Sequence, residues 1–487
     1  MLEKLSFKHF LTGIIFLLII CFIAFYFVKL GSVPYVRVDE GWFTEGSYIL
    51  AEKGYYGSPM FKGYYGAERA FHFHPPLHYV LQAGVFKLFG FGILQGRALS
   101  LLLALLSLFI FYNIMKLLLP DKERIFYLIP ILLLVTTPIF YSIGRTIRPE
   151  NSVLFFSLLS YLLLLRNDLV KKSKTALCFS GVLSACAIIS NISGAYFFLF
   201  ALIWLFLKDK KGLIVFLCGF AIPSFLYLLW IISDWPAFYG QVILQRSAEV
   251  KGNVFNMLWG FIASKTKVTV HFLFLISILA FAYIKNKRIF DKKYFTYYLL
   301  PFITFALILP VLPHINPLYF IVILPFVYLN FSYIYTKLKT PIILTLLMVM
   351  ILVINCYGIY MYYGKYHDYD YNRYINRLSQ KIPEKSNILG IVSLYPGLHK
   401  KGDYTLYAFE NARFSAAGNY SVLKQRINEE YKINYIILDA WISRHKFPGL
   451  EEFLKKDTVE HDRFISPDYG SEGEKRDNLI RIYKIVR

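Results

Sequence analysis

The sequence predicts a polytopic α-helical membrane protein with about eleven transmembrane helices and a small extracytoplasmic α/β domain at its C-terminus. Three observations predict this fold class. First, the 487 residues are 57% hydrophobic and 18% aromatic, which is too apolar for a soluble enzyme. Second, long apolar runs recur through the first three quarters of the chain. Third, lysine and arginine collect at alternate ends of those runs.

The apolar runs define the expected helices. Most match the ~20 residues that a helix needs to cross the hydrocarbon core. One run has double length and predicts two helices with a turn at residues 191–194. The first run is longer than a signal-peptide core and lacks a small-residue cleavage site, so we expect it to stay as a membrane helix. The runs are 10–30, 98–119, 125–143, 152–165, 175–207, 213–232, 268–284, 294–312, 318–335 and 341–363.

The basic residues predict the orientation of the chain. Lysine and arginine occur at every second junction, whereas the short turns around Asn191 and His314 contain neither. Cytoplasmic loops carry this excess of positive charge, so the N-terminus is expected inside and the C-terminus outside. The same loops account for much of the formal net charge of +22, and no nucleic-acid partner is needed to explain it.

Residues 38–77 form a polar stretch between the first two spans. Residues 40–53 within it have apolar side chains every three or four positions, which predicts an amphipathic helix on the membrane surface. Asp39 is its expected N-cap and Gly54 its expected C-terminal stop. This helix belongs to a first outer loop, 31–95, within a membrane module of residues 1–361.

Residues 362–487 form the second predicted domain. The short apolar runs 388–394, 433–438 and 479–486 are expected to be strands, and 420–431 a helix. We find no phosphate-binding glycine loop or catalytic triad in this domain. The five cysteines all lie in apolar runs of the membrane module, so no disulfide framework is indicated for the exported part.

Two histidines, His72 and His74, precede a Pro-Pro pair. The prolines extend the backbone before them, so both rings can face one side. They could form half of a metal site with Glu40 or Glu150, or make ordinary hydrogen bonds. The middles of the spans carry almost no ionisable residues, which argues against an ion-coupled transporter.

Four features follow one another in a specific order. Asp39-Glu40 precedes the amphipathic helix, His74 precedes Pro-Pro, Gly96-Arg97 opens the second span, and Arg-Thr-Ile-Arg-Pro-Glu occupies 145–150. In this order the chain resembles the C-type membrane glycosyltransferases of the protein O-mannosyltransferase and aminoarabinose-transferase group. The resemblance implies transfer of a sugar from a polyprenyl-phosphate lipid to an envelope acceptor on the outer face of the cell membrane. It identifies neither the sugar nor the acceptor.

The resemblance also implies roles for individual residues. Asp39 matches the catalytic aspartate that would take the proton of the acceptor hydroxyl, and Glu40 and Glu150 are expected beside it. Arginine offers a planar fork for a leaving phosphate. The alternatives are that Asp39 only caps a helix and that the arginines only reach lipid headgroups. The expected substrate-binding residues are His72, His74, Arg97, Arg145, Arg148, Lys265, Lys267 and Tyr319.

Two further questions stay open from the sequence. A divalent cation could sit beside the carboxylates, where oxygen ligands favour Mg²⁺, Mn²⁺ or Ca²⁺ and a histidine ligand would admit Zn²⁺. The function could also be that of a polysaccharide polymerase or ligase, or of a non-enzymatic flippase for lipid-linked sugars. The carboxylate pair in the first outer loop favours the transferase.

The topology can be tested with reporters. Because alternate loops carry the basic residues, Arg487 is predicted to lie outside the cytoplasm. A reporter that works only outside the cytoplasm should therefore be active when it is fused there. The measurement is alkaline phosphatase against green fluorescent protein fluorescence in matched fusions. A fluorescent, phosphatase-inactive C-terminus would contradict this orientation.

Overall fold

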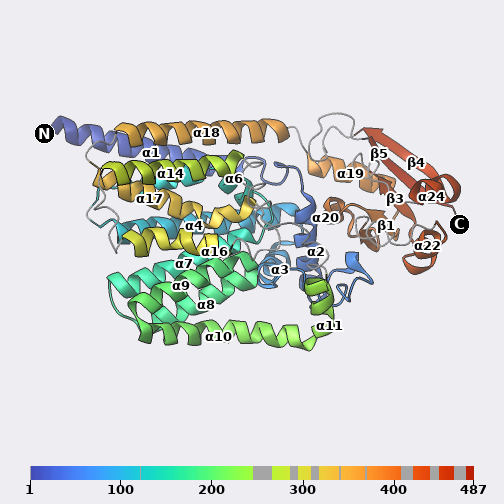
Figure 1. Ribbon diagram of the computed structural model, residues 1–487. Coiled ribbons are helices and arrows are strands. Elements are labelled where there is room, and N and C mark those ends of the chain that lie inside the picture. The colour runs from blue at the N-terminus through green and yellow to red at the C-terminus, as the bar shows by residue number, and fades with distance from the viewer. Residues whose placement is uncertain are drawn as a thin grey trace.

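The computed structural model describes residues 2–120, 122–244, 266–285, 294–308, 317–338, 342–367, 370–406, 420–438, 449–465 and 479–486. Long helices lie side by side in a bundle, and residues 31–92 form a layer across one end of it (Figure 1). The C-terminal strands and helices lie beyond this loop layer (Figure 1). The two chain ends therefore lie at opposite ends of the molecule.

The helices of the bundle coincide with the apolar runs. By length and apolarity, five helices in the described part of the chain can each cross a membrane, and a bent pair adds a sixth. The remaining apolar helices are shorter, so the total of about eleven stays a prediction. The bundle contains α1 (Leu2–Phe27), α4 (Ile93–Leu118), α5 (Ile125–Val135), α6 (Pro138–Gly144), α7 (Glu150–Leu169), α8 (Lys174–Ser190), α9 (Ala195–Lys208), α10 (Lys210–Ser233), α14 (Thr266–Lys285), η5 (Phe295–Leu299), α16 (Leu300–Ile308), α17 (Leu324–Lys337) and α18 (Ile342–Tyr366).

Two breaks in the bundle have local causes. Helices α5 and α6 meet at 69°, and Pro138 at the first turn of α6 cannot donate the hydrogen bond that would continue α5. The turn expected at 191–194 is confirmed as η2 (Ile192–Gly194), with the Asn191 side chain accepting from the Ser193 N–H. The double-length apolar run is therefore two helices.

The contact between α8 and α10 depends on glycine. A Cβ atom on Gly181 would lie 2.0 Å from the Phe216 carbonyl oxygen, and one on Gly219 would lie 2.0 Å from the Cys178 carbonyl oxygen. The two backbones thus approach more closely than any side chain would permit. Small residues give membrane helices this kind of contact, where water provides no driving force between them.

Helix α2 (Val38–Lys53) is the predicted helix of the loop layer, with its ends adjusted. Gly54 ends it in the left-handed conformation at φ 74°, as predicted. The prediction that Asp39 is the N-cap is wrong. Arg37 occupies that position, and the Glu40 side chain accepts from the Arg37 N–H. The side chain of Asp39 is thereby left for other partners.

That α2 lies on the membrane surface stays a prediction, but its apolar face packs on protein and not on lipid. Its polar residues Thr44, Glu45 and Ser47 are as enclosed as its apolar face. Helix α3 (Leu77–Phe89) covers one side, and the short helices η8 (Val392–Leu394) and α20 (Tyr395–Leu398) of the C-terminal region cover another. Protein therefore surrounds α2 where the sequence predicts lipid on one side.

The C-terminal region contains a five-stranded sheet in the order β2-β1-β3-β5-β4. Strand β1 is parallel to β2 and β3, and β5 is antiparallel to β3 and β4. The predicted strands at 433–438 and 479–486 are confirmed, whereas the first ends at Gly390. The elements are α19 (Tyr371–Lys381), β1 (Ile388–Gly390), β2 (Tyr404–Leu406), α22 (Tyr420–Gln425), η9 (Arg426–Glu430), β3 (Tyr435–Leu438), α24 (Leu450–Asp457), β4 (Thr458–Ile465) and β5 (Leu479–Ile485).

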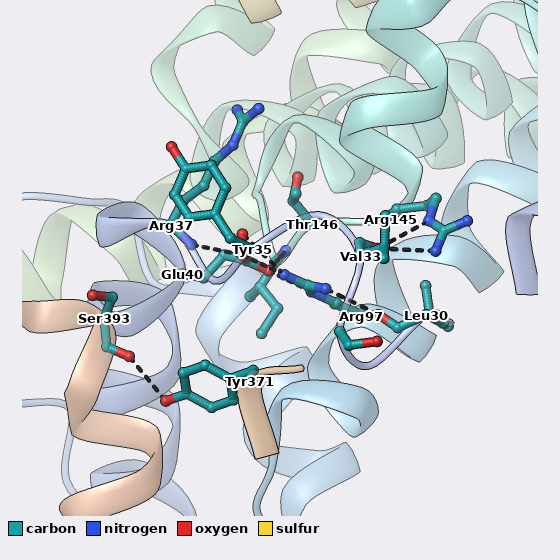
Figure 2. Close-up of polar contacts among 12 residues, drawn as sticks. Leu30, Val33, Tyr35, Arg37, Glu40, Arg97, Arg145, Thr146, Tyr371 and Ser393 are labelled. Carbon is teal, nitrogen blue, oxygen red and sulfur yellow. Dashed lines mark hydrogen bonds and ion pairs between the residues drawn. The ribbon is translucent and has the colours of Figure 1, made fainter. Parts of the chain in front are cut away.

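The C-terminal region and the loop layer share one apolar core. The rings of Tyr48 and Phe91 from the loop layer meet His399, with centroids 4.9 and 4.4 Å from its ring. Close by, Tyr371 donates to the Ser393 carbonyl oxygen at 2.9 Å (Figure 2). This core fixes the position of α2 from the side away from the bundle.

The close contact between α8 and α10 predicts that replacing Gly181 by alanine destabilises the protein, although this substitution normally stabilises a helix. Replacing a helix-interior glycine by alanine normally stabilises a helix by about 1 kcal/mol. We expect Gly13→Ala, where nothing lies within 4 Å of the new Cβ, to raise the melting temperature in detergent slightly. Gly181→Ala should lower it, because α8 and α10 must separate. Equal shifts in the same direction would contradict the close packing.

Candidate active site

The centre of the loop layer is a buried ion pair between Glu40 on α2 and Arg97 on α4. The Arg97 Nε and Nη2 atoms each donate to a Glu40 carboxylate oxygen at 2.8 Å, and both side chains are 0% exposed. Arg97 also donates to the carbonyl oxygen of Leu30 at 3.0 Å (Figure 2). Glu40 further accepts from the backbone N–H of Ile147 at 3.0 Å. Three separate segments are therefore joined at one carboxylate.

This pairing changes the interpretation of two predicted site residues. Glu40 accepts four hydrogen bonds, two of them from the backbone N–H groups of Arg37 and Ile147, and it has no exposed surface. It is therefore enclosed away from any acceptor hydroxyl. Arg97 likewise spends its donors on Glu40 and on backbone carbonyl oxygens. In this conformation both residues position the site, whereas the sequence predicts direct chemical roles.

Arg145 has a third arrangement. Its guanidinium donates to the carbonyl oxygens of Val33 and Phe25 at 2.9 and 3.0 Å, and to that of Val28 (Figure 2 shows the Val33 contact). It also donates to the Tyr141 hydroxyl at 2.9 Å. These bonds fasten the turn after α1 to the end of α6, so the geometry gives Arg145 a structural role in place of the expected phosphate contact.

Asp39 and Glu150 meet through one arginine. The Arg148 Nη1 donates to Asp39 Oδ2, and its Nε and Nη2 donate to the two Glu150 oxygens at 3.0 and 2.8 Å. The Glu150 side chain is fully enclosed and that of Arg148 is 7% exposed, but Asp39 retains 41% exposure. The network thus contains one accessible carboxylate, Asp39, which is paired with the nearly enclosed guanidinium of Arg148.

The local sequence explains how this network forms. Pro149 is the N-cap of α7 and Glu150 its first residue, as the proline before it predicts. The short turn between α6 and α7 brings Arg148 to the N-terminal residues of α2. The prediction that Asp39 and Glu150 lie close together is therefore confirmed.

His74 and Tyr319 lie beside this network. Burial lowers the pKa of His74 to about 4, against the opposing influence of the Asp39 and Glu150 carboxylates. Its imidazole is therefore neutral at pH 7 and can donate or accept a hydrogen bond without carrying charge. Tyr319 in η7 (Pro317–Val322) forms a hydrogen bond with the Asn191 side chain. It lies near enough to Glu150, Arg148 and Asp39 to interact with their charges.

His72 lies away from this network. His72 packs its ring 4.2 Å from that of Trp230, and its Nε2 lies 4.0 Å from Asp234. Lys265 and the side chain of Lys267 lie outside the described residues. Among the residues that are described, no group of three His, Cys, Asp or Glu side chains is arranged to hold a metal ion.

The sequence reasoning missed one residue. Arg37 lies two positions before Asp39, and its Nη2 donates to the Tyr362 hydroxyl of α18 at 2.9 Å. A signal was present, since Arg37 is a cation on the side that the positive-inside rule disfavours. The partner could not be anticipated, because Tyr362 follows it by 325 positions.

Comparison with known proteins gives the fold. ArnT from Cupriavidus metallidurans matches in its apo state with a TM-score of 0.63, at 12% identity, over 97% of this chain and 98% of that chain. Its complex with undecaprenyl phosphate gives 0.64 at 13% identity over the same shares. The chain has the fold of ArnT. The fold expected from the resemblance is thus confirmed.

Two further comparisons extend this result. Residues 73–233 match the family described as dolichyl-phosphate-mannose-protein mannosyltransferase, a segment that includes His74, Arg148 and Glu150. The oligosaccharyltransferase AglB from Archaeoglobus fulgidus, in complex with an inhibitory peptide and a dolichol-phosphate, matches with a TM-score of 0.55. That match has 12% identity and covers 96% of this chain and 75% of that one. No curated protein sequence matches the chain.

The Glu40–Arg97 pair predicts a stability effect. Arg97→Met should cost several kcal/mol, because it leaves a charged Glu40 enclosed without its partner; breaking buried pairs typically costs ~3–5 kcal/mol. The double variant Glu40→Gln with Arg97→Met should regain part of the loss. The measurement is the melting temperature of each purified protein in detergent. Wild-type stability of Arg97→Met, with activity lost, would instead indicate direct substrate binding by Arg97.

Proposed function

We propose that this protein is a membrane glycosyltransferase that moves a sugar from a polyprenyl-phosphate donor to a hydroxyl of an envelope acceptor. The observation that carries the proposal is the Asp39–Arg148–Glu150 network on a C-type fold. The network offers an accessible carboxylate at 41% side-chain exposure, whereas Glu40 and Glu150 are enclosed. An exposed base beside enclosed supporting charges suits attack by an acceptor.

Asp39 would act as the general base. Its free carboxylate surface takes the proton of the acceptor hydroxyl as the oxygen attacks the anomeric carbon. The bond from that carbon to the phosphate oxygen breaks, and the carrier phosphate leaves with the electron pair. Arg148 holds the Asp39 carboxylate in place. The bonds from Arg148 to Glu150 fix the orientation of the Arg148 side chain itself.

The leaving phosphate needs donors near the network. His74 and Tyr319 lie beside Asp39 and Arg148, so we assign them to the carrier phosphate or the sugar. Lys265, which precedes α14, and Lys267, the second residue of α14, remain proposed donors. Neutral His74 would supply a hydrogen bond, and a phosphate placed beside it would favour its charged form.

The carrier is proposed from fold relatives. Undecaprenyl phosphate is bound to ArnT and a dolichol-phosphate to AglB, and this chain shares their fold. We place the site on the outer face of the cell membrane and the C-terminal region outside the cytoplasm, on the distribution of basic residues. The acceptor is left as a hydroxyl of an envelope protein, lipid or glycan.

A divalent cation is a separate proposal. Both oxygens of Glu150 and the Oδ2 of Asp39 already bind Arg148, and His72 lies apart beside Trp230. The described residues as they stand therefore do not fit a metal ion, and each step above proceeds through the protein's own groups. Loss of activity on chelation, restored by one cation, would establish the requirement.

The general base gives the test of the function. Deleting the gene should remove one glycan product from the envelope, detected by mass spectrometry, and wild-type protein should restore it. Asp39→Asn preserves shape but cannot accept the proton, so transfer should fall by ~10²–10⁴-fold. Membrane levels and melting temperature should remain close to wild type.

Glu52→Gln is the matched control, because Glu52 lies exposed on the same helix. It removes an equal charge away from the network and should restore the product fully. If the folded Asp39→Asn protein restored the product at the wild-type rate, Asp39 would not be the base. If deletion changed no glycan, the transferase proposal itself would fail.

A further inference from the structure

Arg37 differs from the other arginines around the site. Its Nη2 donates to the Tyr362 hydroxyl, and its carbon Cζ lies 5.9 Å from the centre of that ring. Its Nε is enclosed and has no hydrogen-bond partner. Among the described residues, no carboxylate lies within ion-pair distance of the Arg37 guanidinium. Arg97, Arg145 and Arg148, by contrast, are each fully engaged by protein atoms.

An enclosed donor without a partner is costly. Leaving a buried polar group unpaired costs ~1–3 kcal/mol, and more when the group is charged. The nearest carboxylate in the sequence does not relieve this cost. Glu40 accepts from the Arg37 backbone N–H, and the Arg37 guanidinium points away from the Glu40–Arg97 pair (Figure 2). The arrangement therefore lacks an anion.

The surroundings of Arg37 favour negative charge. Arg148 disfavours the charge on Arg37, whereas Tyr362, Tyr35 and Glu40 favour it. Arg148 is already paired with Asp39 and Glu150. Arg37 is also the N-cap of α2, a helix of 16 residues, whose N-terminus is the positive end of the helix dipole. The helix dipole therefore favours an anion beside Arg37.

Tyr362 prepares the guanidinium for a specific ligand geometry. Its hydroxyl also lies 3.2 Å from Ser142 Oγ, so the side chain that holds Arg37 is itself held. The Nη1 atom of Arg37 has no protein partner among the described residues and is not enclosed as Nε is, which leaves a guanidinium donor for a tetrahedral anion. Arginine forks match the oxygens of phosphate in this way.

We propose that Arg37 binds a phosphate oxygen of a lipid-linked substrate, next to the base. This inference rests on the proposed function and adds a residue to its site. The phosphate can belong to the polyprenyl carrier or to a phosphorylated acceptor lipid, since both present the same oxygens. Arg37 can offer its guanidinium to a ligand, whereas Arg97 and Arg145 donate to protein atoms.

The test is lipid binding by the full-length protein in detergent. The probes are undecaprenyl phosphate, undecaprenol as its uncharged counterpart, and phosphatidic acid as a phosphomonoester lipid without a polyprenyl chain. Arg37→Met should weaken binding of a phosphate probe about 10–100-fold, the usual range for a charge-assisted hydrogen bond. Undecaprenol binding should not change. Arg37→Lys should be intermediate, because it retains charge and loses the fork.

Arg373→Met is the matched control, since Arg373 is an exposed cation on α19. It removes the same charge and should bind every probe as wild type. Tyr362→Phe leaves Arg37 in place without its hydroxyl partner and should weaken the same probe by a smaller factor. It also keeps the proposal testable if Arg37→Met does not fold, as judged by melting temperature.

The outcomes separate the two phosphate sources. Weaker undecaprenyl phosphate binding with unchanged phosphatidic acid binding assigns Arg37 to the carrier, and the reverse assigns it to an acceptor phosphate. Wild-type binding of both phosphate probes by folded Arg37→Met, or by Arg37→Lys and Tyr362→Phe together, overturns the proposal. In that case loss of transfer by Asp39→Asn would still support the glycosyltransferase.

Discussion

The buried ion pair between Glu40 and Arg97 is the constraint on which the site depends. Two charges at 0% exposure are stable only while every remaining lone pair and proton is satisfied. The turn after α1, the start of α4 and the turn before α7 must therefore all keep their places around one carboxylate. The side chain of the preceding residue, Asp39, contacts Arg148 and is 41% exposed. An enclosed carboxylate thereby fixes the position of the accessible carboxylate that we propose as the base.

The adjacent acids thus have opposite environments. Glu40 is enclosed and takes four hydrogen bonds, two of them from backbone N–H groups. Asp39 shares one arginine with Glu150 and keeps open surface. Active sites commonly combine a group that reacts with groups that only hold geometry. Here that division falls between neighbouring residues of one helix.

The sequence predicted the bundle well because apolar length and charge placement are local properties. It placed the break at 191–194, the C-terminal end of α2 and the meeting of Asp39 with Glu150. The sequence alone could not distinguish arginines that are free to bind a ligand from arginines that hold the protein together. Whether Arg145 meets a phosphate or a carbonyl depends on the path of residues 25–33, over a hundred positions earlier. Arg37 was missed for the same reason, since its partner Tyr362 comes from α18.

The enclosure of α2 has a consequence for how the protein is made. Its residues leave the ribosome within the first ninth of the chain, and α3 can cover one side almost at once. The other side is closed by η8 and α20, at residues 392–398, after the bundle helices have been synthesised. Until then the side of α2 that carries Tyr48 has no covering from the C-terminal region. The enclosed position of α2 therefore depends on residues that are synthesised late in translation.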